Sequence, residues 1–125
     1  MFNWKKSKYP DFRILNTFYK RGFYFLKNAE WSWLDEESIL VTEPHKLDVI
    51  TLTGWPRFIF LSAIGDKTVE EFVYSVADQY AEAIPGTLDK VLVHELLELE
   101  SKKIILLTNK KQVLPTEFDL PGLKG

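Results

Sequence analysis

Hydrophobic residues recur at helical spacing in the second half of the 125-residue chain. Within residues 65–80, GDKTVEEFVYSVADQY, the apolar positions fall on one side of a helix. They are Val69, Phe72, Val73, Val76 and Tyr80. Thr68 and Glu71 stand just before and within the first turn at the spacing of a capping box, in which each side chain bonds the other residue's backbone amide. The pattern predicts a helix that begins after Thr68.

Two further helices are predicted, one on each side of this stretch. Residues 54–65, GWPRFIFLSAIG, are apolar on nearly all sides, which is typical of a buried helix with proline near its start and glycine just past its end. Residues 87–102 place leucine on one core face, at Leu88, Leu92, Leu96 and Leu99. Val93 and Leu97 form a second apolar strip on another side of that helix, and a helix that is apolar on two sides is usually covered on both.

Runs of β-branched and aromatic residues predict strands elsewhere in the chain. SILVT and DVITLT, joined by EPHKL, indicate a β-hairpin over residues 38–53. FYFLKN and WSWLD indicate short strands, and the preceding FRILNTFYK allows a helix with Ile14, Leu15, Phe18 and Tyr19 on one side. KIILLT (residues 103–108) indicates a later strand, with QVLP (residues 112–115) as its candidate return strand.

These elements predict one α+β domain, which is usual for a chain of this length. The expected architecture is an N-terminal β-hairpin plus a three-helix winged-helix bundle with C-terminal wing strands. We expect a basic aromatic N-terminal arm over residues 1–37, a winged-helix core over residues 38–114 and an extended tail over residues 115–125.

Composition narrows the class of protein. The chain has no cysteine, so it has neither a disulfide framework nor a thiolate metal site. No apolar run approaches the ~20 residues that span a bilayer, and no apolar segment follows the basic start MFNWKKSKYP as it would in a signal peptide. We therefore expect a cytoplasmic protein without a membrane segment.

The sequence contains no recognisable catalytic or metal-binding motif. HELLE, at residues 94–98, has the i, i+4 spacing of a zinc-binding helix, but Glu98 stands where that motif needs a second histidine. The serines of the helical part have no neighbouring elbow glycines, and no glycine-rich phosphate loop occurs. We expect no metal, no cofactor, no catalytic residue and no enzyme activity.

The distribution of charge bears on nucleic-acid binding. Residues 1–29 are predominantly basic and residues 65–100 predominantly acidic. A helix that enters a DNA groove needs Lys and Arg, whereas residues 87–101 carry one lysine against the acids Asp89, Glu95, Glu98 and Glu100. The alternative that stays open is a DNA-binding winged-helix regulator that uses the basic arm and the wing lysines Lys102, Lys103, Lys110 and Lys111.

The order of a hairpin and three helices resembles the PqqD-like family over roughly residues 38–107. The resemblance lies in LVTEPHKLDVITLTGWPRFIFLSAIGDKTVEEFVYSVADQY and in LDKVLVHELLELESKKIILL. It implies a strand hairpin followed by a winged-helix trihelical bundle. It also implies a non-catalytic module that binds a precursor or leader peptide by strand addition. Such a module presents the peptide to a partner enzyme, often a radical S-adenosylmethionine protein.

Carried onto this sequence, the resemblance implies a peptide site made of an edge strand and a helix face. The strand residues are Asp48, Val49, Ile50, Thr51 and Leu52, and the helix residues are Lys90, Val93, His94 and Leu97. Two features depart from the family: 37 residues precede the hairpin, and the hairpin loop lacks the family's usual short turn. The N-terminal arm, or a second subunit in a homodimer, stays an alternative occupant of the Val93–Leu97 strip.

Overall fold

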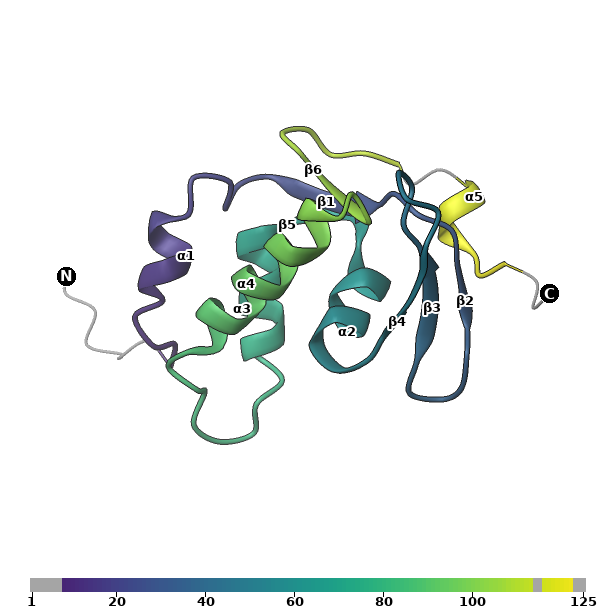
Figure 1. Cartoon of the computed structure of the whole chain (residues 1–125). Coiled ribbons are helices and arrows are strands. Elements are labelled where there is room, and N and C mark those ends of the chain that lie inside the picture. Colours follow the sequence, from purple (N-terminus) through teal and green to yellow (C-terminus); the bar gives the residue numbers. More distant parts are fainter. Residues whose placement is uncertain (1–7, 114–115, 123–125) are drawn as a thin grey trace.

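A computed structural model describes residues 8–113 and 116–122 of the chain. In that part the chain forms five helices and two antiparallel three-stranded sheets, which confirms the α+β class (Figure 1). The helices are α1 (Arg13–Thr17), α2 (Gly54–Ser62), α3 (Val69–Ala77), α4 (Leu88–Ser101) and α5 (Thr116–Asp119). The strands are β1 (Tyr24–Lys27), β2 (Trp31–Trp33), β3 (Ile39–Thr42), β4 (Val49–Leu52), β5 (Ile64–Thr68) and β6 (Ile105–Thr108).

The predicted hairpin and the three predicted helices are present. β3 pairs with β4 in the register Ile39 to Leu52 through Thr42 to Val49, and β2 adds to the other side of β3. α2, α3 and α4 correspond to the three helical patterns, and each contributes buried apolar residues to one core.

The N-terminal segment contributes the centre of the other sheet. The strand order of that sheet is β5-β1-β6, with β1 antiparallel to both neighbours. Phe12, Leu15 and Phe25 from this segment are fully buried in the core. Residues 8–27 are therefore built into the fold, where the sequence suggested an added arm.

The structure differs from the expected arrangement of wing strands after α4. β6 pairs along its whole length with β1, and residues 109–113 form no strand. Residues 114–115 of the predicted return strand lie outside the described residues. The helix predicted over residues 54–65 ends at Ser62, and the stretch before α3 forms strand β5. Gly65 fits there because its φ is 84° and because a Cβ would approach the backbone oxygen of Gln112 to 2.7 Å.

Lys27 joins the end of β1 to the end of α2. Its buried Nζ donates to the carbonyl oxygens of Leu61 and Ala63, at 3.3 and 3.4 Å. These carbonyls lie at the C-terminus of α2, where the helix dipole concentrates negative charge. Burial lowers the pKa of Lys27, and the charge of Asp119 in α5 acts in the opposite direction.

The capping box of α3 is confirmed. The Thr68 hydroxyl accepts a hydrogen bond from the Glu71 amide at 3.1 Å, and the Glu71 carboxylate accepts one from the Thr68 amide at 2.9 Å. Both bonds satisfy first-turn amides that have no partner within the helix.

Replacement of the cap hydroxyl should destabilise the fold. We expect Thr68→Ala to lower the free energy of unfolding by about 1 kcal/mol, because the Glu71 amide loses its acceptor. Thr68→Ser keeps the hydroxyl and is the matched control, with a loss of only a few tenths of a kcal/mol expected. Urea unfolding measures both, and equal losses in the two variants would contradict the capping role.

Candidate functional site

The outer face of α4 borders a cavity of about 660 Å³. The four helix residues predicted from the sequence all line it, namely Lys90, Val93, His94 and Leu97. Ile14 of α1 lines it as well, and Thr87, Val91 and Glu95 complete the wall. A single helix face therefore brings the predicted helix residues together.

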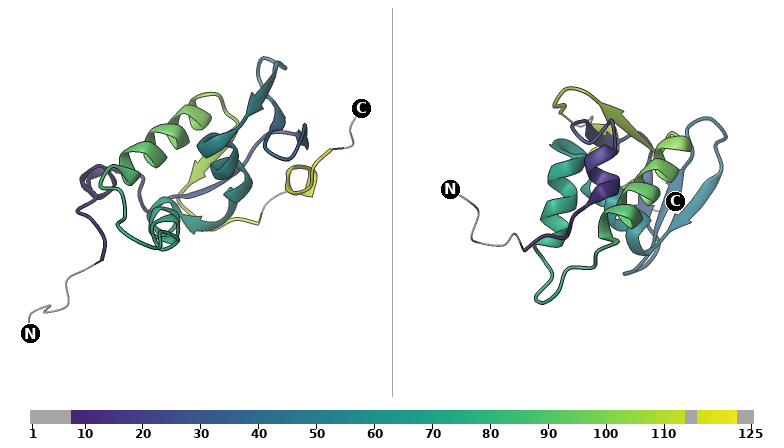
Figure 2. Two further views of the ribbon diagram at one scale, coloured as in Figure 1. Left: turned by 90° about the horizontal axis from the view of Figure 1, so that it is seen from below. Right: turned by 90° about the vertical axis from the view of Figure 1, so that its left-hand side faces the viewer.

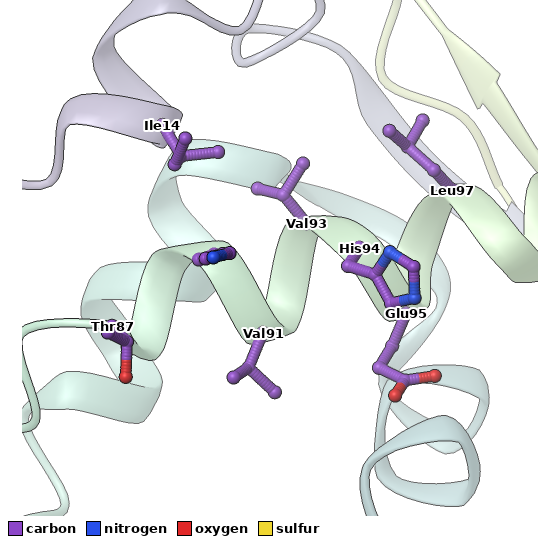
Figure 3. A pocket seen from close by; sticks show the side chains of 8 residues that line it. Ile14, Thr87, Val91, Val93, His94, Glu95 and Leu97 are labelled. Atoms are coloured by element: carbon purple, nitrogen blue, oxygen red, sulfur yellow. The ribbon is translucent and has the colours of Figure 1, made fainter.

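The two flanks of α4 carry different side chains. Ile14, Val93 and Leu97 lie on one flank, and Val91 and Glu95 point to the opposite one (Figure 3). Val93 is only 4% exposed, whereas Ile14 and Leu97 are 44% and 38% exposed. Apolar side chains that stay this open beside a cavity are suited to contact with a ligand.

α1 covers part of the second apolar strip of α4. The short helix packs beside α4, as the right-hand view of Figure 2 shows. Val93 is buried, and Leu97 is exposed. The N-terminal segment thus occupies one end of the strip and leaves the other end accessible.

Asp89 fixes α1 to α4. Its carboxylate, 2% exposed, accepts a hydrogen bond from the Leu15 amide at 3.0 Å. The carboxylate lies in the first turn of α4, where the helix dipole favours negative charge. Asp89 belongs to the acids expected to repel DNA from this helix, but the structure buries it against Leu15. Its position beside Leu88 and Leu92 on the core face is the sequence signal for that burial.

Loss of the Asp89 carboxylate should loosen α1. We expect Asp89→Ala to destabilise the protein by about 1–3 kcal/mol, because a buried amide is left without an acceptor. Asp89→Asn keeps an acceptor oxygen and should cost clearly less. Thermal or urea unfolding compares the two variants, and an Asp89→Asn loss as large as that of Asp89→Ala would count against the hydrogen bond.

The predicted strand residues lie on a separate surface. β4 forms one edge of the sheet β2-β3-β4, and no described strand pairs with its outer side. None of the residues Asp48–Leu52 is among those that line the α4 cavity. The structure therefore divides the predicted peptide site into an open strand edge and a helix face.

The register of the hairpin shows which backbone groups of β4 point outward. The Glu43 amide donates to the Asp48 carbonyl at 2.8 Å, so this pair is bonded across the hairpin. Antiparallel pairs alternate, so the pairs of Ile50 and Leu52 with β3 are also bonded. The amide and carbonyl groups of Val49 and Thr51 consequently point to the outer edge.

The opposite edge of the same sheet is covered. The Gly122 amide donates to the Trp31 carbonyl of β2 at 2.6 Å. The Trp31 indole also donates to the Phe118 carbonyl of α5 at 3.0 Å. Residues 116–122 thus protect the β2 edge and leave β4 as the accessible edge of this sheet.

α4 ends in a Schellman motif that places a lysine where glycine is usual. The Ile104 amide donates to the Leu99 carbonyl at 3.0 Å, and the Lys103 amide to the Glu100 carbonyl at 2.9 Å. Lys103 has a φ of 63°, in the left-handed region. A residue with a Cβ is strained in that region, and glycine is not.

Glycine at this position should stabilise the fold. We expect Lys103→Gly to raise the free energy of unfolding by up to about 1 kcal/mol, because the left-handed strain is removed. Lys102→Gly is the matched control: φ is −90° at Lys102, so glycine brings only backbone entropy and a loss of about 0.5–1 kcal/mol is expected. Urea unfolding measures both, and a loss in both variants would contradict the strain at Lys103.

The described residues contain neither a cluster of metal-ligating side chains nor a membrane-spanning helix. In residues 8–113 and 116–122, no three histidine, cysteine or acidic side chains stand close enough together to hold a metal ion. No helix in the same ranges is long and apolar enough to cross a bilayer.

No protein-family model, curated protein or solved structure matches this chain in the three comparisons made. The function is therefore inferred from the geometry of the β4 edge and the α4 face.

Proposed function

We propose that the protein is a non-catalytic module that binds an extended peptide, or an extended segment of a partner protein, by strand addition to β4. The outer edge of β4 carries this proposal. Val49 and Thr51 turn their backbone groups away from β3, and no described strand pairs with them. An added strand can pair with these groups, and main-chain bonds of this kind hold peptides in strand-addition sites.

The side chains of β4 support the same use. Val49 is 59% exposed and Thr51 is exposed, whereas Leu52 is buried against the core. A strand beside β4 would place one of its residues against Val49, and β-branched and aromatic residues make the most favourable cross-strand pairs with valine. We therefore expect the bound segment to carry such a residue there.

The order of elements supports a relation to the PqqD-like pattern. The hairpin β3-β4 is followed by α2, α3 and α4, as in a hairpin with a trihelical bundle. In our proposal the β1-β6 pair stands in place of the wing. By the same resemblance, the proposed recipient of the peptide is a radical S-adenosylmethionine enzyme, and the cavity on α4 receives apolar side chains of the ligand beyond the strand.

The DNA-binding alternative has less support. It depends on a two-stranded wing, and residues 109–113 form no return strand for β6. α4 carries Glu95 and Glu98 on its outer side. These charges oppose the approach of phosphates.

Strand addition can be tested with peptides selected from a random 12-residue display library on the immobilised full-length protein. We expect selected peptides to slow amide hydrogen exchange at Val49 and Thr51. We also expect Thr51→Pro to weaken their binding about tenfold, because the outward donor is lost and the ring obstructs the edge.

Thr51→Val is the matched control, because it keeps the amide and should bind within about twofold of the unchanged protein. Proline is tolerated where an edge amide faces solvent, so Thr51→Pro should retain its fold, which circular dichroism checks. Failure to select any peptide, or selected peptides that bind Thr51→Pro undiminished, would overturn the proposal.

A further inference from the structure

Three lysines gather where the hairpin loop meets the end of α4. A hollow of about 200 Å³ lies between the two segments. The loop contributes Glu43, His45 and Lys46, and the end of the helix contributes Ser101, Lys102 and Lys103. The left-hand view of Figure 2 shows the hairpin beside this end of α4. The fold thus brings together cations that lie far apart in the sequence.

The charges of the hollow are not balanced within the protein. Lys46, Lys102 and Lys103 make no ion pair with any described residue. Glu43 is the one carboxylate in the lining, and it is 7% exposed. The accessible surface of the hollow is therefore cationic, and an anionic group that enters it meets several ammonium groups at once.

The backbone conformation of Lys103 lowers the stability of the fold. Its left-handed backbone favours glycine, and its side chain gains no ion pair in return within the described residues. Residues held in strained conformations concentrate at binding sites, where the surrounding structure maintains them. Lys103 fits that description because its side chain lines the hollow.

The surroundings of the hollow favour a short acidic segment over a polyphosphate. Glu98 stands one helical turn before Lys102, and Glu95 nearly one turn before Glu98, on the same side of α4. A nucleic acid needs a continuous basic track, and these carboxylates interrupt it. Asp48 adds an acid at the start of β4. A ligand matched to this pattern has a few negative charges at one end and none farther along.

The hollow also adjoins the start of the strand edge. The loop that carries His45 and Lys46 leads directly into β4, whose first outward backbone groups belong to Val49. A strand added along β4 therefore passes the hairpin loop at one of its ends. Side chains beyond that end would lie beside the loop that carries Lys46, which lines the hollow.

We propose that this hollow binds carboxylate groups, and that the peptide bound at β4 carries acidic residues at the end that passes the hairpin loop. The identity of the ligand rests on the proposed function, whereas the carboxylate site itself does not. Lys46, Lys102 and Lys103 hold the carboxylates by charge-assisted hydrogen bonds, and the loop fixes where the acidic end stops.

The carboxylate site can be tested with a blocked triglutamate peptide, titrated into isotope-labelled full-length protein and followed by NMR. We expect saturable shifts in the amide signals of residues 45–47 and 101–104. Blocked triglutamine should cause none. Sodium tripolyphosphate distinguishes the anion: if it binds this site more tightly than triglutamate, the hollow is a phosphate site and the carboxylate proposal is wrong.

Variants separate binding from folding. Lys103→Gly should weaken triglutamate binding about threefold, although it is expected to make the fold more stable, because one charged donor is removed. The double variant Lys102→Gln with Lys103→Gly should weaken binding about tenfold. Lys110→Gln is the matched control, because Lys110 is an exposed lysine outside the hollow, and it should bind as the unchanged protein does.

The two proposals fail separately. If triglutamate leaves the amide signals of residues 45–47 and 101–104 unshifted, or if Lys103→Gly binds it undiminished, the carboxylate site is wrong even when selected peptides protect Val49 and Thr51. If the site binds triglutamate but no library peptide protects Val49 and Thr51, strand addition is wrong and the carboxylate site stands. Selected peptides without acidic residues at one end would overturn the ligand assignment alone.

Discussion

The pairing of β1 on both of its sides is the interaction on which the rest of the structure depends. β1 hydrogen-bonds to β5 on one edge and to β6 on the other, so it joins the segment between α2 and α3 to the segment that follows α4. The Val69 amide at the start of α3 donates to the Phe23 carbonyl, just before β1. Phe25 packs edge-on against Phe72 of α3, with ring centroids 5.1 Å apart. Lys27 then binds the end of α2.

This central strand explains why one edge of the other sheet is open. β6 pairs with β1, so it does not form the wing that the order of the helices suggests. The hairpin β3-β4 lies in the second sheet, and residues 116–122 cover that sheet on the β2 side. No described strand pairs with the outer edge of β4, and in our proposal this edge and the neighbouring end of α4 bind the ligand through backbone groups on one side and lysines at one end.

The structural features that could be predicted from the sequence depend on residues that lie close together in the chain. The capping box at Thr68, the leucine face of α4 and the β-branched runs of the hairpin each carry their own signal within a few residues. Lys90, Val93, His94 and Leu97 line one cavity because a helix face is a local pattern. The placement of β1 between β5 and β6 was not predictable in this way, because strand pairing joins distant segments. The burial of Asp89 and the meeting of Lys46 with Lys102 have the same non-local cause.

Amide hydrogen exchange of the full-length protein, read residue by residue by NMR, tests this account most directly. The central position of β1 predicts that the amides of residues 24–27 exchange among the slowest of the chain. The open edge predicts that the amides of Val49 and Thr51 exchange much faster than those of Ile50 and Leu52, which bond to β3. Fast exchange throughout β1, or equal protection of all four β4 amides, would contradict the account.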